Sequence, residues 1–335
     1  MKTIGITTTV PVEVLLAAKL KPVDLNNTFV VHEAYGHLID TAEQAGFPKS
    51  LCAWIKGLYG ACQVEAPDYI LGVIEGDCSN TKALLDVLAL ENREIIPFGF
   101  PHDQTQYAME KAVTGLMDRL EVTRDQVEKV RNQVADIRDM VAELDERTWK
   151  THQVSGFENH LWQVSSSDFG GDVDQFRSTI QDLLEEVRQR PANEKKLRLA
   201  YMGVPPMTGD LYDYVESLDA KILYNEVQRE FAFPRAKFAK TIENQYLDFT
   251  YPYSLEGRLI EIQKQIDLRQ IDGVIHYTQA FCHKAVEDIV VKHQLNVPVI
   301  NIEGDRLNTL DARTKLRLEA WLDMLLDQKE GLSCE

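Results

Sequence analysis

Three cysteines stand far apart in this sequence, and each lies near the predicted end of a strand or start of a helix. Cys52 falls in the first turn of a predicted helix for which Ser50 is the expected N-cap. Cys78 comes soon after the apolar run 69–74, and Cys282 follows another predicted strand by five residues. Thiolates are soft ligands, and three of them would hold an iron-sulfur cluster with one open iron. From chain position alone, metal binding, catalysis and burial as small apolar side chains all remain open.

Two further cysteines and four polar residues complete the candidate set. Cys62 ends a run of small residues, which favours packing, although this thiol could also cap a cluster. Cys334 lies at the end of the chain, where we expect an inert thiol. Candidate proton donors or acceptors near the first two cysteines are His32, Glu33, His37 and Ser79. For His32, Glu33 and His37 a surface loop position is favoured over catalysis, and a plain N-cap role explains Ser79 as well as a catalytic role does.

The composition argues against several classes of protein. The chain has 335 residues, of which 44% are apolar and 27% charged, enough for a sizeable core in two or three domains. The net charge of −17 would repel a phosphate backbone, so we expect no nucleic acid partner. No apolar run reaches the roughly 18 residues of a membrane span, and the first residues lack a signal-peptide pattern. We therefore expect a cytoplasmic protein whose cysteines stay reduced.

Two regions of the sequence alternate short apolar runs with amphipathic segments, as βα units around a parallel sheet do. The predicted strands of the first region are 2–8, 20–25, 69–74 and 95–98. Those of the second region are 197–203, 221–224, 273–277 and 297–302. Their similar element order indicates a duplicated unit. Cys78 and Cys282 thereby lie near carboxyl ends of strands, the edge where open α/β sheets bind ligands.

A helical segment separates the two regions. Apolar residues recur at three- and four-residue steps from 123 to 144, which predicts a helix whose apolar face packs into the core. Further helices are predicted at 11–18, 176–187, 257–268, 284–293 and 309–326. We therefore predict an α/β fold with an N-terminal domain 1–102, a helical segment and linker 103–195, and a C-terminal domain 196–335.

Several blocks of residues together resemble the 2-hydroxyacyl-CoA dehydratase and benzoyl-CoA reductase family. The blocks span nearly the whole chain and keep the family's order and spacing. They are Thr9–Ala18, Leu20–Val23, Asp272–Ile275, Phe281–Cys282, Val297–Asp305, Arg313 and Arg317–Trp321. The resemblance implies two flavodoxin/Rossmann-like parallel-sheet domains with a helical segment, and a [4Fe-4S] cluster bound by Cys52, Cys78 and Cys282.

The same resemblance implies how such a protein works. Family members act as dimers with an identical or paralogous subunit, and an ATP-hydrolysing iron-sulfur activator supplies them with low-potential electrons. They use these electrons for radical dehydration of an acyl-CoA or for reduction of an aromatic ring. We therefore expect an enzyme, a lyase or an ATP-dependent reductase. The chain is short for the family and Cys62 is additional, which leaves the substrate open.

Two alternatives to a dehydratase subunit stay open. The first is a homodimeric reductase of small molecules that carries a double-cubane cluster, as one branch of the family does. The second is an electron-transfer or scaffold protein that keeps the fold without catalysis. A double cubane needs six thiolates, and this chain has five cysteines.

Overall fold

Four short strands form each of two parallel sheets in the computed structural model, which describes residues 1–232, 239–306 and 309–332. The first sheet has the order β2-β1-β3-β4, with strands β1 Thr3–Ile6, β2 Lys21–Asp24, β3 Tyr69–Glu75 and β4 Ile95–Gly99. The second has the order β6-β5-β7-β8, with strands β5 Leu197–Met202, β6 Ala220–Asn225, β7 Gly273–Gln279 and β8 Val299–Gly304. All neighbouring strands are parallel. The shared order confirms the predicted α/β fold with two parallel sheets.

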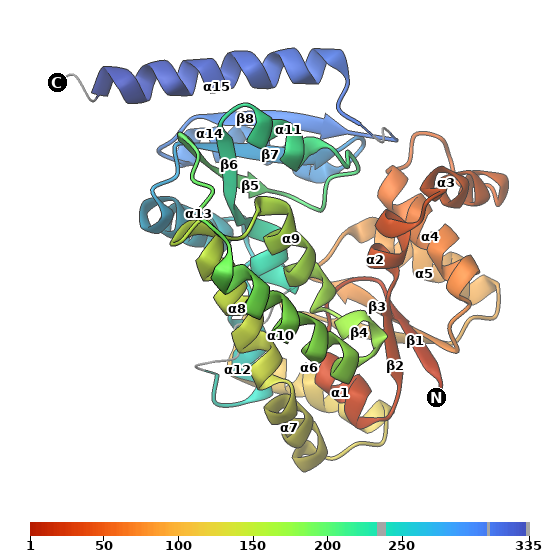
Figure 1. Ribbon diagram of the computed structural model, residues 1–335. Coiled ribbons are helices and arrows are strands. Elements are labelled where there is room, and N and C mark those ends of the chain that lie inside the picture. The colour runs from red at the N-terminus through yellow and green to blue at the C-terminus, as the bar shows by residue number, and fades with distance from the viewer. Residues whose placement is uncertain (233–238, 307–308, 333–335) are drawn as a thin grey trace. The chain divides into compact units, whose positions relative to one another are not determined.

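Helices connect and cover these strands (Figure 1). Before β5 they are α1 Val12–Ala17, α2 Leu25–Val31, α3 Tyr35–Gln44, α4 Ala53–Glu65, α5 Ser79–Leu90, α6 Gln106–Arg119, α7 Arg124–Gln133, α8 Ala135–Trp149, α9 Gly156–Ser165 and α10 Val173–Gln189. After β5 they are α11 Leu211–Ser217, α12 Ile242–Leu247, α13 Leu255–Arg269, α14 Asp288–Gln294 and α15 Ala312–Leu332. Short 3₁₀ turns at Phe169–Gly171 and His283–Ala285 and a π-helical turn at Gln228–Ala232 add to these.

The chain separates into two compact units, each containing one sheet. The first unit comprises Met1–Ala142, Gln163–Asp182 and Glu230–Ser254. The second comprises Glu143–Trp162, Leu183–Arg229 and Leu255–Glu335. Three of the five boundaries between them fall within α8, α9 and α10, one falls within the π-helical turn, and one falls directly before α13.

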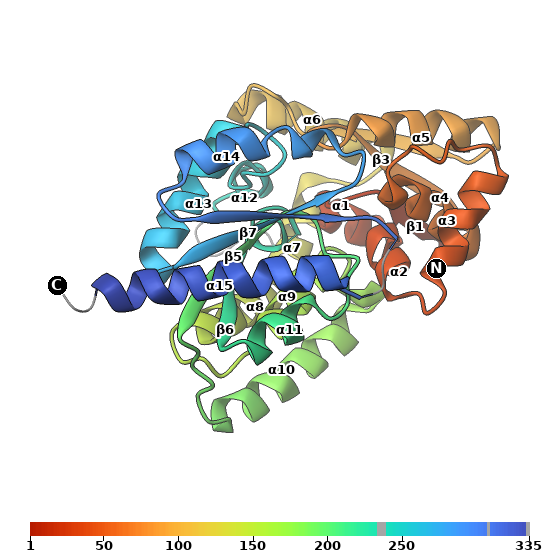
Figure 2. The same ribbon diagram turned by 90° about the horizontal axis from the view of Figure 1, so that it is seen from above.

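In the second unit, helices cover both faces of the sheet (Figure 2). Residues of α11 and α15, among them Leu211 and Leu318, form a core with Tyr201 of β5. Ile262 of α13 and Val291 of α14 form a separate core against the opposite face. Burial on both faces explains why the strand sequences are almost continuously apolar rather than alternating.

In the first unit, α4 is buried along most of its length. Every residue from Ala53 to Cys62 is buried, and the helix packs against α2 and α3, which lie beside it in Figure 1. Glycines permit this close approach. A Cβ atom at Gly57 would lie 2.2 Å from the Phe29 ring, and one at Gly60 would lie 2.4 Å from the Leu38 carbonyl oxygen.

Two helix predictions were wrong in detail. The periodic segment 123–144 forms two helices, because the backbone turns at Val134 (φ −101°, ψ 0°). Its apolar face is nevertheless buried at Val127, Val134, Ile137, Val141 and Leu144, whereas Val130, on the same predicted face, is half-buried. The predicted helix 284–293 is a 3₁₀ turn followed by α14, because tight three-residue hydrogen bonds such as Ala285 N–H to Cys282 C=O begin it. Periodicity misses both breaks because the apolar face continues across a one-turn irregularity.

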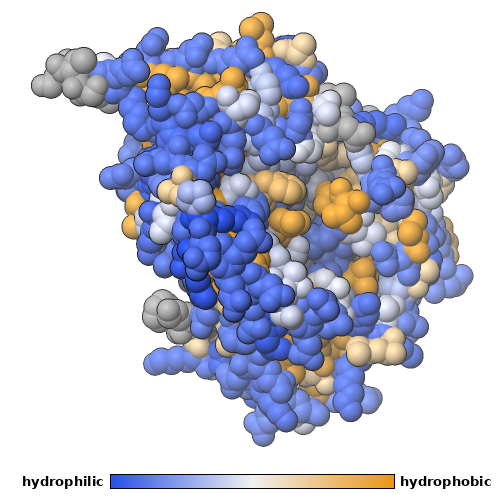
Figure 3. Space-filling view, in the orientation of Figure 1, coloured by the Kyte–Doolittle hydropathy of each residue, from blue (hydrophilic) through white to orange (hydrophobic). Residues whose placement is uncertain are grey.

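The face of the molecule in Figure 3 is mostly hydrophilic, with separate hydrophobic patches. This agrees with 53 acidic against 36 basic residues in the chain. Within residues 1–232, 239–306 and 309–332, no helix is long and apolar enough to cross a membrane. Even the 21-residue α15 carries charged side chains along its length.

The packing of α4 generates a prediction. Gly60→Ala should lower the free energy of unfolding by about 1 to 3 kcal/mol, because the new methyl group meets the Leu38 backbone rather than a movable side chain. Gly115→Ala is the matched control, because Gly115 lies in α6 and no atom is within 4 Å of an added Cβ. This substitution should raise the free energy of unfolding by about 0.5 to 1 kcal/mol, because alanine favours a helix over glycine. Urea unfolding measures both. Equal effects at the two glycines would contradict the close contact.

Candidate functional site

Cys78 is presented by a tight turn at the end of β3. The strand ends at Glu75, Gly76 takes a left-handed conformation (φ 87°), and Cys78 is the N-cap of α5. A Cβ atom at Gly76 would lie 2.7 Å from Phe100 and 2.9 Å from the carbonyl oxygen of Pro252, so the turn requires glycine. The Cys78 side chain is partly buried beyond the carboxyl end of its strand.

Cys52 reaches the same edge of the first sheet from a helix. Cys52 itself, and not Ser50 as predicted, is the N-cap of α4, so it precedes the first turn. Only three residues join the C-terminal end of α4 to the start of β3. The helix, about 20 Å long, therefore runs back along the strand, and its N-terminus lies at the carboxyl edge. Cys52 is 7% exposed there.

Cys282 also follows a strand through a short turn, in the second unit. β7 ends at Gln279, Phe281 is left-handed (φ 64°), and Cys282 is the N-cap of the 3₁₀ turn. The strand is longer than predicted, so Cys282 follows its end by three residues and not by five. Cys78 follows the end of β3 by the same interval.

These two cysteines occupy corresponding positions in the two sheets. β3 and β7 are each the third strand of their sheet, and the sheets share one strand order. In each sheet, the second strand lies on one side of the first strand, and the third and fourth strands lie on the other side. The loops after the first and third strands therefore flank the topological switch point, where α/β sheets bind ligands. Cys78 and Cys282 both lie in the loop after the third strand.

Ion pairs hold the turn that carries Cys282. Arg258 of α13 is 2% exposed and donates from Nε to Glu226 at 2.9 Å and from Nη1 to Glu287 at 2.8 Å. Lys284, two residues after Cys282, donates to Glu287 at 3.3 Å. The buried guanidinium thus joins the segment after Cys282 to α13 and to the end of β6.

The remaining cysteines lie elsewhere. Cys62 is fully buried in the last turns of α4, and burial raises the pKa of its thiol to about 11. It lies ten positions after Cys52, and ten steps of a helix rise about 15 Å. Cys334 falls outside the described residues.

The four polar candidates lie at or near the surface. His32 is half-buried after α2 and accepts a hydrogen bond at Nδ1 from the Ala34 N–H, 3.1 Å away. Glu33 and His37 are exposed, and Ser79 is the exposed first residue of α5. Among the described residues, no three His, Cys, Asp or Glu side chains form a group arranged to hold a metal ion.

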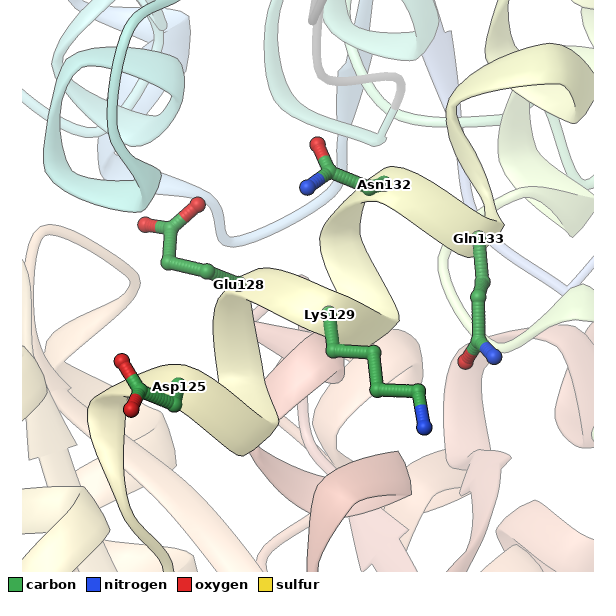
Figure 4. A pocket seen from close by; sticks show the side chains of 5 residues that line it. All are labelled: Asp125, Glu128, Lys129, Asn132 and Gln133. Carbon is green, nitrogen blue, oxygen red and sulfur yellow. The ribbon is translucent and has the colours of Figure 1, made fainter.

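Two surface depressions lie away from these residues. One, of about 510 Å³, is lined by Asp125, Glu128, Lys129, Asn132 and Gln133, all from α7 (Figure 4). Their side chains spread along a single helix and do not converge on a common point. The other, of about 740 Å³, lies over α13 and α14. Neither contains a cysteine.

Comparison with protein families identifies the chain's relatives. The model of the 2-hydroxyglutaryl-CoA dehydratase D-component matches residues 7–325, nearly the whole chain. The chain belongs to the 2-hydroxyglutaryl-CoA dehydratase D-component family. This confirms the resemblance drawn from the sequence blocks. A comparison with curated proteins found no match.

This D-component family member also contains a buried carboxyl pair that the sequence analysis missed. Asp24 ends β2, and its Oδ2 accepts a 2.6 Å hydrogen bond from the Ser167 hydroxyl. Asp168 accepts at Oδ2 from the backbone N–H of Asp24, 2.7 Å away, and at Oδ1 from that of Gly170. Burial, and then the neighbouring Asp24, raise the pKa of Asp168 to about 7. No local signal could have paired residues 144 positions apart.

The raised pKa predicts how stability depends on pH. Because the folded protein holds the Asp168 proton more tightly than the unfolded chain, this group stabilises the fold below about pH 4. Its contribution is lost as the pH rises towards 7. In wild type, the free energy of unfolding should fall between pH 4 and 7, and Asp168→Asn should make this fall smaller. The substitution should also lower the free energy of unfolding by a constant amount at every pH, because one hydrogen bond is lost. Asp182→Asn, exposed on α10, is the control. Denaturant unfolding across this range measures the effect, and parallel profiles for wild type and Asp168→Asn would refute it.

Proposed function

We propose that this chain is the iron-sulfur subunit of a 2-hydroxyacyl-CoA dehydratase-type system, with Cys52, Cys78 and Cys282 as ligands of a [4Fe-4S] cluster. The observation that carries the proposal is that Cys78 and Cys282 occupy corresponding N-cap positions beyond the third strand of two identically ordered sheets. Cys52, a third N-cap, lies at the same sheet edge as Cys78.

The donor set and its surroundings suit the cluster chemically. A cluster held by three thiolates supplies a low-potential electron and one iron with an open position that can act as a Lewis acid. Thiolates at Cys52 and Cys78 would be stabilised by the positive ends of α4 and α5, which these cysteines cap. Backbone N–H groups in those first turns are suitable donors to cluster sulfur or to an anionic substrate group. The burial of Cys52 would keep water from one side of the site.

The proposed reaction requires partners. Low-potential electrons would come from an ATP-dependent iron-sulfur activator, and an identical or paralogous subunit would complete a dimer. The substrate would be a 2-hydroxyacyl-CoA or a related thioester. Family membership supports each of these assignments. The alternative of a double-cubane reductase is less well supported, because five cysteines cannot supply six thiolates and Cys62 is fully buried.

Iron analysis tests the proposal. Anaerobically purified protein should hold about four irons and four acid-labile sulfides per chain and show a paramagnetic signal when reduced. Cys282→Ser should lose the cluster and keep the fold, whereas Cys62→Ala should keep both. About eight irons per chain would favour the double-cubane reductase. Unchanged iron in Cys282→Ser would exclude Cys282 as an essential ligand, and no iron after reconstitution would favour the electron-transfer or scaffold alternative.

A further inference from the structure

One amide group joins three segments of the first unit at the carboxyl edge of its sheet. Asn26, in the first turn of α2, donates from Nδ2 to the Thr7 carbonyl oxygen at 2.9 Å and to Asp24 Oδ1 at 2.8 Å. Its Oδ1 accepts from Trp54 Nε1 at 2.7 Å. Thr7 directly follows β1, Asp24 ends β2, and Trp54 is the second residue of α4. The amide therefore connects two strand ends to the start of the helix that Cys52 caps.

We propose that Asn26 is a positioning residue that fixes Cys52 relative to the strand ends of the first sheet. The geometry points to this role because Trp54 lies two residues from Cys52, so a hydrogen bond that holds the indole also holds the first turn of α4. The relevance of the placement to a cluster rests on the proposed function. The hydrogen bonds themselves are formed by protein atoms alone and do not depend on a cluster.

The chemistry of the contacts requires an amide. The site needs one acceptor for the indole N–H and two donors for the Thr7 carbonyl and the Asp24 carboxylate, and a primary amide supplies this set. A carboxylate in place of Asn26 would face Asp24 without donors. An apolar side chain would leave the indole N–H of Trp54 without a hydrogen-bond acceptor, although Trp54 is only 9% exposed.

The same connection extends to the strand that leads to Cys78. The Thr7 N–H donates to the Leu71 carbonyl at 3.2 Å, and Thr7 Oγ1 accepts from the Val73 N–H at 3.1 Å. Leu71 and Val73 belong to β3, whose end carries the Cys78 turn. Hydrogen bonds from Thr7 therefore link Asn26, and with it the start of α4, to the strand that precedes Cys78.

The remainder of α4 is held independently of Asn26, which makes a local effect measurable. Further along the helix, the Tyr59 hydroxyl donates to Glu91 at 2.6 Å, and Gly60 lies directly against the Leu38 backbone. Loss of the amide should therefore loosen the first turn of α4 while the helix itself stays folded.

Thiol alkylation of the full-length apoprotein tests the inference. Trp54→Phe removes the indole N–H and keeps an aromatic ring, and Asn26→Leu removes the amide at similar volume. Mass spectrometry follows the iodoacetamide alkylation rate of Cys52. Trp54→Phe should raise this rate about tenfold, as expected for local opening after loss of one buried hydrogen bond. Asn26→Leu should raise it by at least as much, because it removes all three hydrogen bonds of the amide. The rate at Cys78 should change less than about twofold. Asn159→Ala is the matched control, because Asn159 is a buried amide of the second unit that donates to Asp145.

Reconstituted protein supplies the second readout. Both variants should lose iron to a chelator faster than wild type, while Asn159→Ala should not. An unchanged Cys52 rate in both variants would overturn the inference, and so would equal acceleration at Cys52, Cys62 and Cys78, which indicates general loosening. Wild type that binds no iron would reject the proposed function, and the alkylation rates would still decide the role of Asn26.

Discussion

All four strands of each sheet run in one direction, and the positions of the chemically useful side chains depend on this constraint. Parallel strands need a crossover between them, so the loops that follow the strands collect at one edge of the sheet. In the first unit, that edge holds Thr7, Asp24 and the Cys78 turn. In the second it holds the Cys282 turn. Helix α4 returns along β3 and brings Cys52 to the edge of the first sheet.

Polar side chains beneath these edges are buried, and they are satisfied either by neutral partners or by opposite charges. In the first unit, neutral amide and hydroxyl groups surround the Asp24–Asp168 carboxyl pair, and burial, followed by the neighbouring Asp24, raises the pKa of Asp168. The buried Arg138 of the same unit pairs with Glu13. In the second, Arg258 binds Glu226 and Glu287, so charges compensate each other. A satisfied buried network holds its members in one arrangement, because each donor that moves leaves an acceptor unpaired. Both arrangements therefore favour a single geometry for the loops above them.

The correspondence between the two sheets covers only two of the three cysteines. Cys78 and Cys282 correspond, but Cys52 has no counterpart. The helix that precedes β7, as α4 precedes β3, is α13, and Ser254 stands immediately before it. The two repeats therefore supply an odd number of thiols at these positions. A three-thiolate donor set leaves one iron of a cubane without a protein sulfur, which is the feature that the proposed chemistry uses.

The sequence alone determined the positions of the strands and of two cysteine-bearing loops. Apolar runs located the eight strands, and strand ends followed by cysteines located the Cys78 and Cys282 loops, because both signals arise within a few residues. The tertiary structure decided what joins distant segments. It made Cys52 and not Ser50 the cap of α4, and it buried Cys62 beyond reach of Cys52. It also paired Asp24 with Asp168 and brought Asn26 to Trp54. These contacts depend on how helices pack against the sheet, and residues far apart in the chain carry no local periodicity that reports such packing.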